Sequence, residues 1–101
     1  GLLAAQPVAA GGLRGPARGS RVEVRFRHGG ETLQPAGRAH HHTLKKLFQE
    51  WDVPEWERGR VPLLYIDDTL AAVAGLCVCE GFQADAAQAG LALHWSRSTQ
   101  W

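Results

Sequence analysis

The sequence has few cysteines, and their spacing does not suit a structural disulfide. Cys77 and Cys79 are the only two, and a single residue separates them. A bridge across one residue is strained, because a disulfide needs a particular separation and angle between its α-carbons. We therefore predict that both thiols are reduced and pack as small hydrophobic side chains. Reduced thiols are typical of a cytoplasmic protein, and we expect that location.

Long hydrophobic runs and a strong excess of one charge are also absent. No stretch reaches the roughly 18 to 20 apolar residues of a membrane-spanning helix, so no contact with a membrane is expected. The net charge is only +1 over 101 residues. Any surface that binds nucleic acid must therefore be a local patch. The length and the composition, 45% hydrophobic and 21% charged, are typical of one globular domain.

The patterns of common catalytic sites do not occur. Gly29-Gly30 is not followed by the Lys-Ser/Thr of a phosphate-binding loop. The serines lie near the two ends of the chain, without a Ser/His/Asp arrangement. The acidic pairs Asp67-Asp68 and Glu55/Glu57 fall in a predicted turn and a short predicted helix, where solvent-exposed carboxylates are common. We expect no catalytic residue in this chain.

The run His40-His41-His42 is the main candidate for a metal site. Imidazole is a good ligand for several transition metals. Three consecutive histidines in a loop cannot all face one ion, however, and a dedicated site normally adds ligands at spaced positions. We favour a polar loop and expect no metal. A small metal-dependent enzyme built on the histidines and the two cysteines is an alternative.

Residues 1–20 differ in composition from the rest of the chain. They are rich in Gly, Ala and Pro and contain no acidic residue. We expect a flexible or loosely docked segment, in which Leu2-Leu3 and Val8 can add a short strand. Residues 21–101 then form the domain proper.

The first strong signal is the strict alternation of charged and apolar residues over Arg21–Arg27. This period of two predicts a half-buried strand. Val22, Val24 and Phe26 are predicted to face the core. The charged residues between them are predicted to face solvent or a ligand. The stretch 31–42, interrupted by Pro and Gly, reads as a loop.

A helix is predicted over Leu44–Trp51. Its apolar residues are spaced i, i+3, i+4 and i+7, which places them on one face. Thr43 is a suitable N-cap. Lys45, Lys46 and Gln49 then fall on the exposed face. Pro54 ends this helix and begins a short second one over Pro54–Arg58.

The remaining chain predicts strands. Val61–Ile66 and Leu70–Cys79 are apolar runs separated by a turn, which indicates a buried hairpin, with Gly75 as a bulge or a point of close approach. The segment 81–90 reads as a loop with at most one helical turn. Leu91–Trp95 alternates and forms a last strand. The fold class is therefore α+β, with a small, mainly antiparallel sheet packed against one main helix and a short second helix.

Several motifs follow one another in an order that resembles a known family. They are Val24-Arg25-Phe26-Arg27, His28-Gly29-Gly30-Glu31, Gly37-Arg38, Leu44-Lys45-Lys46-Leu47-Phe48-Gln49-Glu50, Val53-Pro54-Glu55-Trp56-Glu57-Arg58, Val61-Pro62-Leu63-Leu64-Tyr65 and Leu70-Ala71-Ala72-Val73-Ala74-Gly75. The chain resembles the C-terminal domain of bacterial tRNA(Ile)-lysidine synthetases over about residues 21–80, and more loosely over the last strand.

The resemblance implies an enzyme that joins lysine to the wobble cytidine of an isoleucine tRNA, using ATP with magnesium. In that family ATP binds a separate N-terminal catalytic domain with a Ser-Gly-Gly-x-Asp-Ser loop. No such sequence occurs here, so no cofactor is expected in this chain. What carries over is the role of the C-terminal domain, which contacts the tRNA near its acceptor stem. The implied partners are this tRNA and the enzyme's own N-terminal domain.

The positive charges suit that role. Eight of the eleven Lys and Arg residues fall between Arg21 and Arg60. Duplex RNA is read mainly by shape, through phosphate and 2′-hydroxyl contacts, and this needs spaced cations on a rigid support. The candidate RNA-binding residues are Arg25, Arg27, Arg38, Lys45, Lys46, Gln49, Arg58 and Arg60. The triple histidine and Glu57 depart from the family and weaken the patch.

A second hypothesis is a protein-interaction or scaffolding domain without RNA contact. The chain would then pack on the rest of its own enzyme or on a second copy, as a homodimer, and its basic residues would be an ordinary solvated surface. Among the aromatic residues, the helical spacing places Trp51 in the core. Trp56, beside Pro54 on a short helix, is more open and could stack on bases.

Overall fold

The computed structural model describes residues 2–8, 12–14, 19–84 and 90–96, with residues 2–8 and 92–96 described by their backbone. The elements in chain order are β1 (Leu2–Val8), β2 (Val22–Arg25), β3 (Thr32–Leu33), β4 (His42–Thr43), α1 (Leu44–Glu50), α2 (Glu55–Arg58), β5 (Leu63–Ile66), β6 (Thr69–Val73), β7 (Cys77–Val78) and β8 (Gly90–Ser96). Within these residues no helix is long and apolar enough to cross a membrane.

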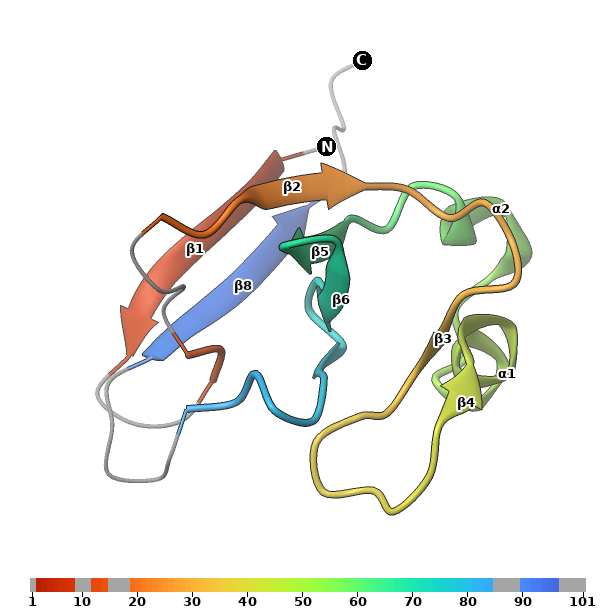
Figure 1. Cartoon of the computed structure of the whole chain (residues 1–101). Helices are drawn as coiled ribbons and strands as arrows, with labels where there is room; N and C mark the ends of the chain where they lie inside the picture. Colours follow the sequence, from red (N-terminus) through yellow and green to blue (C-terminus); the bar gives the residue numbers. More distant parts are fainter. Residues whose placement is uncertain (1, 9–11, 15–18, 85–89, 97–101) are drawn as a thin grey trace.

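All strand pairings are antiparallel. The main sheet has four strands in the order β2-β5-β6-β7, and the pairs β1-β8 and β3-β4 form two smaller sheets. The β1-β8 ribbon lies on one side of the molecule and the two helices lie on the other (Figure 1). This arrangement confirms the predicted α+β class with one main and one short helix.

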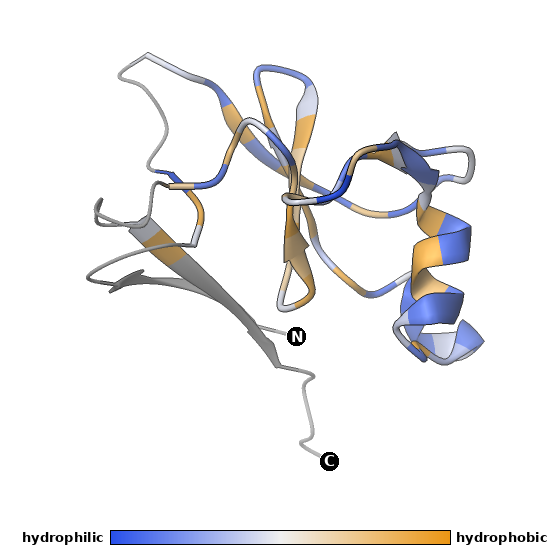
Figure 2. Cartoon of the chain, turned by 90° about the horizontal axis from the view of Figure 1, so that it is seen from below, coloured by the Kyte–Doolittle hydropathy of each residue, from blue (hydrophilic) through white to orange (hydrophobic). Residues whose placement is uncertain are grey.

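The hydrophobic core has two parts, because the central strand β5 points its side chains alternately to both faces of the sheet. Leu63 packs with the apolar face of α1, in a cluster completed by Leu33, Leu44, Leu47, Phe48, Val53, Val61, Val73 and Cys79. Leu64 and Ile66 face the other way and pack with Leu13, Ala71 and Ala72. Figure 2 shows hydrophobic segments running through the central strands and alternating with hydrophilic ones along the helix.

The helix α1 confirms its sequence signals. The hydroxyl oxygen of Thr43 accepts a hydrogen bond from the backbone N–H of Lys46 at 3.2 Å, as expected of an N-cap. The helix ends at Glu50, and Asp52 has a positive φ of 56° that turns the chain away. Trp51 lies against the core, with its ring 6.4 Å from that of Phe48 in an edge-to-face arrangement.

The turn between β5 and β6 ties down the start of β2. Asp67 and Asp68 both have positive φ, 50° and 65°, which a two-residue hairpin loop requires and which Asp tolerates better than most residues. The backbone N–H of Asp67 donates to the carbonyl oxygen of Arg21 at 2.8 Å. In return the Asp67 carboxylate accepts from the Arg21 N–H at 2.9 Å.

The predicted orientation of the first strand is wrong. Val22, Val24 and Phe26 are 47%, 47% and 50% exposed, whereas Arg25 lies across the ring of Tyr65, with its guanidinium carbon 4.3 Å from the ring centroid. An arginine can cover an aromatic ring and keep its charge paired, so the charged side of an edge strand can be the better covered one. The alternation identified the strand correctly and its covered face incorrectly.

Two further predictions need correction. The run Leu70–Cys79 is not one strand, because a turn at Gly75 (φ 74°) separates β6 from β7. The loop expected over 31–42 contains the short strand β3 and the first residue of β4. The last strand is confirmed as β8, and the short strand expected near the N-terminus is present as β1. The helical turn considered within 81–90 falls largely on residues 85–89, which lie outside the described residues.

Candidate nucleic-acid interface

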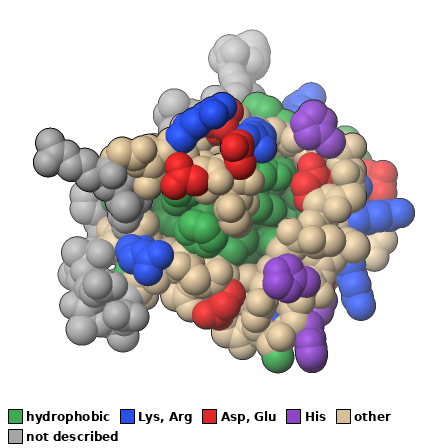
Figure 3. Space-filling view, viewed as in Figure 1, with side chains coloured by type: hydrophobic (Ala, Val, Ile, Leu, Met, Phe, Trp, Pro, Cys, Tyr) green, Lys and Arg blue, Asp and Glu red, His purple; other side chains and the backbone are tan. Residues whose placement is uncertain are grey.

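The exposed face of α1 carries two of the candidate basic side chains. Lys45, Lys46 and Gln49 are exposed, while Leu47 and Phe48 on the opposite face are fully buried and anchor the helix. Among the described residues no ion pair involves either lysine. Figure 3 shows Lys and Arg side chains projecting from the edge of the molecule where α1 lies. The helix therefore presents two lysines outside any described ion pair on a rigid support, with the charge of Glu50 one turn from Lys46.

Arg38 lies beside the same helix but is paired. Its guanidinium donates two hydrogen bonds to the carboxylate of Glu50, at 2.8 and 3.0 Å. This contact is the main reason why the pKa of Glu50 is lowered and that of Arg38 is raised. Both side chains are partly exposed, so the pair can open toward solvent. Arg38 therefore lies near the predicted patch, but the carboxylate of Glu50 balances its charge.

Arg58 is a structural residue in this chain, because its side chain is only 8% exposed. Its Nε donates to the carbonyl oxygen of Val53 at 2.8 Å, and its guanidinium carbon lies 5.9 Å from the ring centroid of Phe48. One terminal nitrogen is buried without a hydrogen-bond partner, 3.6 Å from a carboxylate oxygen of Glu55. Little of Arg58 is accessible to a ligand, so this side chain contributes to packing and not to the exposed basic surface.

The other predicted arginines differ in how far they are covered. Arg27 is half-buried and also lies 5.9 Å from the Phe48 ring centroid, so it borders the base of α1. Arg60 is exposed after α2, and no ion pair is described for it. Trp56 on α2 is 74% exposed, which places it at the surface.

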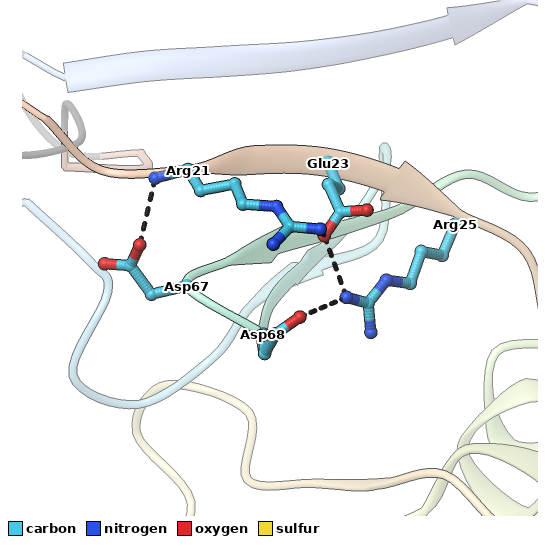
Figure 4. Close-up of polar contacts among 5 residues, drawn as sticks. All are labelled: Arg21, Glu23, Arg25, Asp67 and Asp68. Atoms are coloured by element: carbon cyan, nitrogen blue, oxygen red, sulfur yellow. Dashed lines mark hydrogen bonds and ion pairs between the residues drawn. The ribbon is translucent and has the colours of Figure 1, made fainter.

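Arg25 belongs to a separate, mixed cluster at the turn between β5 and β6 (Figure 4). It donates to Glu23 at 2.9 Å and to Asp68, and these bonds, in that order, raise its pKa. Arg21 lies 3.3 Å from the same Glu23 carboxylate. With Asp67, three carboxylates face two arginines here. This corner is therefore no cationic patch, and Arg25 is not brought together with the lysines of α1.

The histidines and cysteines do not converge. His40 and His41 are exposed and His42 is half-buried, and the described residues contain no group of three or more His, Cys, Asp or Glu that could hold a metal. Cys77 and Cys79 are free thiols in or beside the first core cluster. Hydrogen bonding from Cys79 lowers the pKa of Cys77, and the same contact raises the pKa of Cys79.

Sequence reasoning missed the carboxylates that neutralise part of the patch. Glu50 follows Lys46 by four residues, a spacing that places the two side chains together on a helix and could have been read directly. No spacing in the sequence predicts that Glu50 also pairs with Arg38, which lies in a loop before the helix. The exposed apolar side of β2 was also missed, because alternation alone does not say which side is covered.

Comparison with known proteins identifies the family. A family model described as the TilS substrate C-terminal domain matches residues 22–95, which is most of the chain. The chain belongs to this family. It is 54% identical over 84 residues to a tRNA(Ile)-lysidine synthase of Coxiella burnetii, covering 83% of this chain and 19% of that protein. A tRNA(Ile)-lysidine synthase of Photobacterium profundum is 49% identical over 83 residues, 81% of this chain and 19% of that protein.

The family match covers β2 to β8 and therefore includes α1, α2 and the whole main sheet. The chain spans about a fifth of the length of these curated relatives. The resemblance seen in the motifs over residues 21–80 is thus confirmed as membership of the TilS C-terminal domain family.

Proposed function

We propose that this chain binds tRNA through the exposed face of α1. The observation that carries the proposal is the position of Lys45 and Lys46, which are exposed and form no ion pair with the described residues, in a chain of the TilS C-terminal domain family. Cations on a rigid helix suit the phosphates of a duplex, whose spacing is regular. Gln49, on the same face, can bond a 2′-hydroxyl.

Three arginines extend this surface. Arg27 borders the helix at Phe48, Arg60 is exposed beyond α2, and Arg38 can exchange the carboxylate of Glu50 for a phosphate. The exchange keeps two charge-assisted bonds, because a guanidinium matches both anions in the same geometry. Shape rather than base identity would then select the bound region, which we propose to be the acceptor-stem side of an isoleucine tRNA.

For the complete enzyme we propose the activity that the relatives' names describe, lysidine synthesis on tRNA(Ile), in the cytoplasm. A lysine would be joined to the wobble cytidine at the expense of ATP, with magnesium, in a separate N-terminal catalytic domain. This chain contains no Ser-Gly-Gly-x-Asp-Ser loop. It would therefore serve recognition, and the N-terminal domain would be its partner in the same polypeptide.

A binding titration at several salt concentrations tests the role of α1. With fluorescently labelled tRNA(Ile), the chain should bind with an affinity that falls as salt rises, because bound counterions are released from the phosphates. Lys45→Ala combined with Lys46→Ala should weaken binding and reduce the slope of log K against log salt by about one to two.

The matched control removes two charges elsewhere. Arg14 and Arg21 are both exposed and lie away from α1, so Arg14→Ala combined with Arg21→Ala changes the net charge equally. This control should leave the slope almost unchanged. Equal slopes for the lysine variant and the unmodified chain would exclude the helix from the interface.

A protein-interaction role is the second candidate, and one observation favours it. Val22, Val24 and Phe26 form an exposed apolar stripe, 47%, 47% and 50% exposed, on an edge strand of the main sheet. If this were the only function, the chain would bind no tRNA at any salt concentration. The two roles use different faces and can coexist.

A further inference from the structure

The two edges of the main sheet are treated differently. At the β7 edge the backbone is covered, because the N–H of Ala36 donates to the carbonyl oxygen of Val78 and the N–H of Glu80 donates to that of Gln34. At the other edge, β2 pairs with β5 on one side, and none of the described strands pairs with its outer side. An open edge is a template for the addition of another strand.

The register shows which backbone groups point outward. The N–H of Asp67 donates to the carbonyl oxygen of Arg21, so the backbone of Arg21 faces β5, and in an antiparallel ladder the next residues to do so are Glu23 and Arg25. The N–H and carbonyl groups of Val22 and Val24 must then point away from β5. The same residues carry half-exposed apolar side chains, and Phe26 continues the stripe. The outer edge of β2 thus presents unpaired backbone groups and apolar side chains to a partner strand.

The strand is complementary to itself when a second copy is laid antiparallel with Val24 opposite Val24. In this register Val22 meets Phe26 of the second copy and Glu23 meets Arg25. The first pairing is apolar and the second joins opposite charges, and both kinds favour antiparallel strands. Glu23 and Arg25 already contact each other at 2.9 Å within one chain (Figure 4), so both side chains lie on the same face of the strand. Because the N–H and carbonyl groups of Val24 point outward, the two facing Val24 residues can form a hydrogen-bonded pair across the new interface.

We propose that two copies of this chain associate through their β2 edges, joining the two four-stranded sheets into one continuous sheet. The charges favour this occupant over RNA, because three carboxylates face only two arginines beside the strand, which leaves no excess of positive charge for phosphate. They also favour it over an arbitrary extended peptide, which would lack the reciprocal Glu23–Arg25 contacts. The surface is separate from the lysines of α1, so the inference does not depend on tRNA binding.

Sedimentation equilibrium of the chain without RNA tests the proposal. The average mass should rise with concentration from 11.0 kDa toward twice that value. Val24→Lys should weaken the association at least about tenfold, since it places two like charges directly opposite each other. The matched control is Leu76→Lys, which adds the same charge at an exposed apolar residue in the turn between β6 and β7 and should leave association unchanged.

Disulfide trapping checks the register without relying on a disruptive variant. Residues in a hydrogen-bonded antiparallel pair have α-carbons about 5.5 Å apart, within reach of a disulfide. With oxidised glutathione as the oxidant, two Val24→Cys chains should form one intermolecular disulfide and release reduced glutathione. Leu76→Cys, with the same native cysteines present, should not be trapped.

Three results would overturn the proposal. They are a chain that stays monomeric at all concentrations, a dimer that persists in folded Val24→Lys, and equal trapping of the two cysteine variants. None of these results bears on tRNA binding, which is measured by the salt titration.

Discussion

Residues of the same type have different roles in this molecule according to the partners that surround them. Arg58 and Arg60 are two residues apart, yet the first is buried against Phe48 and the second is exposed. Counting basic residues along the chain cannot separate such cases. What separates them is whether the guanidinium is covered and what accepts its hydrogen bonds.

Arg58 therefore gives a stability prediction. Arg58→Ala should lower the free energy of unfolding by about 2 to 4 kcal/mol, because it removes packing on Phe48 and leaves the Val53 carbonyl oxygen without its buried donor. Urea unfolding followed by tryptophan fluorescence measures this. Arg60→Ala, at an exposed position, should change it by less than about 0.5 kcal/mol. Similar losses in both variants would contradict the structural role.

At the scale of the element, α1 combines a fully buried side with a side that carries Lys45 and Lys46. The buried side was predictable, since helical spacing of apolar residues is a local property of the sequence. The net charge of the exposed side was not, because Arg38 reaches Glu50 from a different part of the chain. The helix is therefore less positive at its C-terminal end than its sequence suggests.

Glu50 should restrain RNA binding. Glu50→Gln removes a negative charge from α1 and frees Arg38, so the affinity for tRNA at low salt should rise, by up to about fivefold if the pair is worth less than about 1 kcal/mol. The same titration in high salt should show a smaller gain, because screening weakens both charges. Glu55→Gln, which removes an 83% exposed carboxylate on α2, is the matched control. If Glu50→Gln raised the affinity for tRNA no more than Glu55→Gln does, the position of the carboxylate on α1 would be unimportant.

The strand β2 is the element that the sequence describes least well. The alternation of charged and apolar residues predicts a strand whether it lies at the edge or in the centre of a sheet. In an edge strand neither face is fully covered, so the alternation does not show which face is the more buried one. Tyr65, on the neighbouring strand, provides a ring on which Arg25 lies, and this tertiary contact makes the charged side the better covered one. The apolar side is left for another chain in our proposal.

At the scale of the whole molecule, carboxylates fix loops, some within one turn and others between parts of the chain that are far apart in the sequence. Glu31 accepts hydrogen bonds from the N–H groups of His28 and Gly29 at 2.7 and 2.9 Å. Glu80 accepts from the N–H of Gly37 at 3.1 Å, and Glu50 binds Arg38. The Glu31 contacts thus fix a local turn, whereas Glu80 and Glu50 tie the loop of Gly37 and Arg38 to the end of β7 and to α1.

These contacts predict that acid destabilises the fold. Burial raises the pKa of Glu31, but the N–H groups that it accepts from outweigh this effect, so its pKa is lowered in the folded state. Gln83 and the backbone of Gly37 lower that of Glu80, and Arg38 lowers that of Glu50. A lowered folded pKa means that the unfolded chain binds more protons in acid. The three carboxylates therefore add to the free energy of unfolding above the ordinary pKa of glutamate. This contribution is lost as the pH falls through their lowered pKa values in the folded state.

Thermal unfolding between pH 7 and pH 3 measures the effect. Tm should fall as the pH drops, and Glu31→Gln should lower Tm at neutral pH while making the remaining fall smaller. Asp52→Asn, at an exposed carboxylate outside the described ion pairs, serves as the control and should leave the profile unchanged. A Glu31→Gln profile parallel to that of the unmodified chain would exclude a contribution from this residue.

The sequence by itself determined both helices, the longer strands and the family, because helical and strand periodicities are local and the motifs of the TilS C-terminal domain are contiguous. It also identified Thr43 as a cap and the exposed positions of Lys45 and Lys46. Only the tertiary structure decided which charges stay free, which side of β2 is covered and which sheet edge stays open. These depend on residues brought together from distant parts of the chain, such as Arg38 with Glu50 and Arg25 with Tyr65, and no local pattern records such contacts.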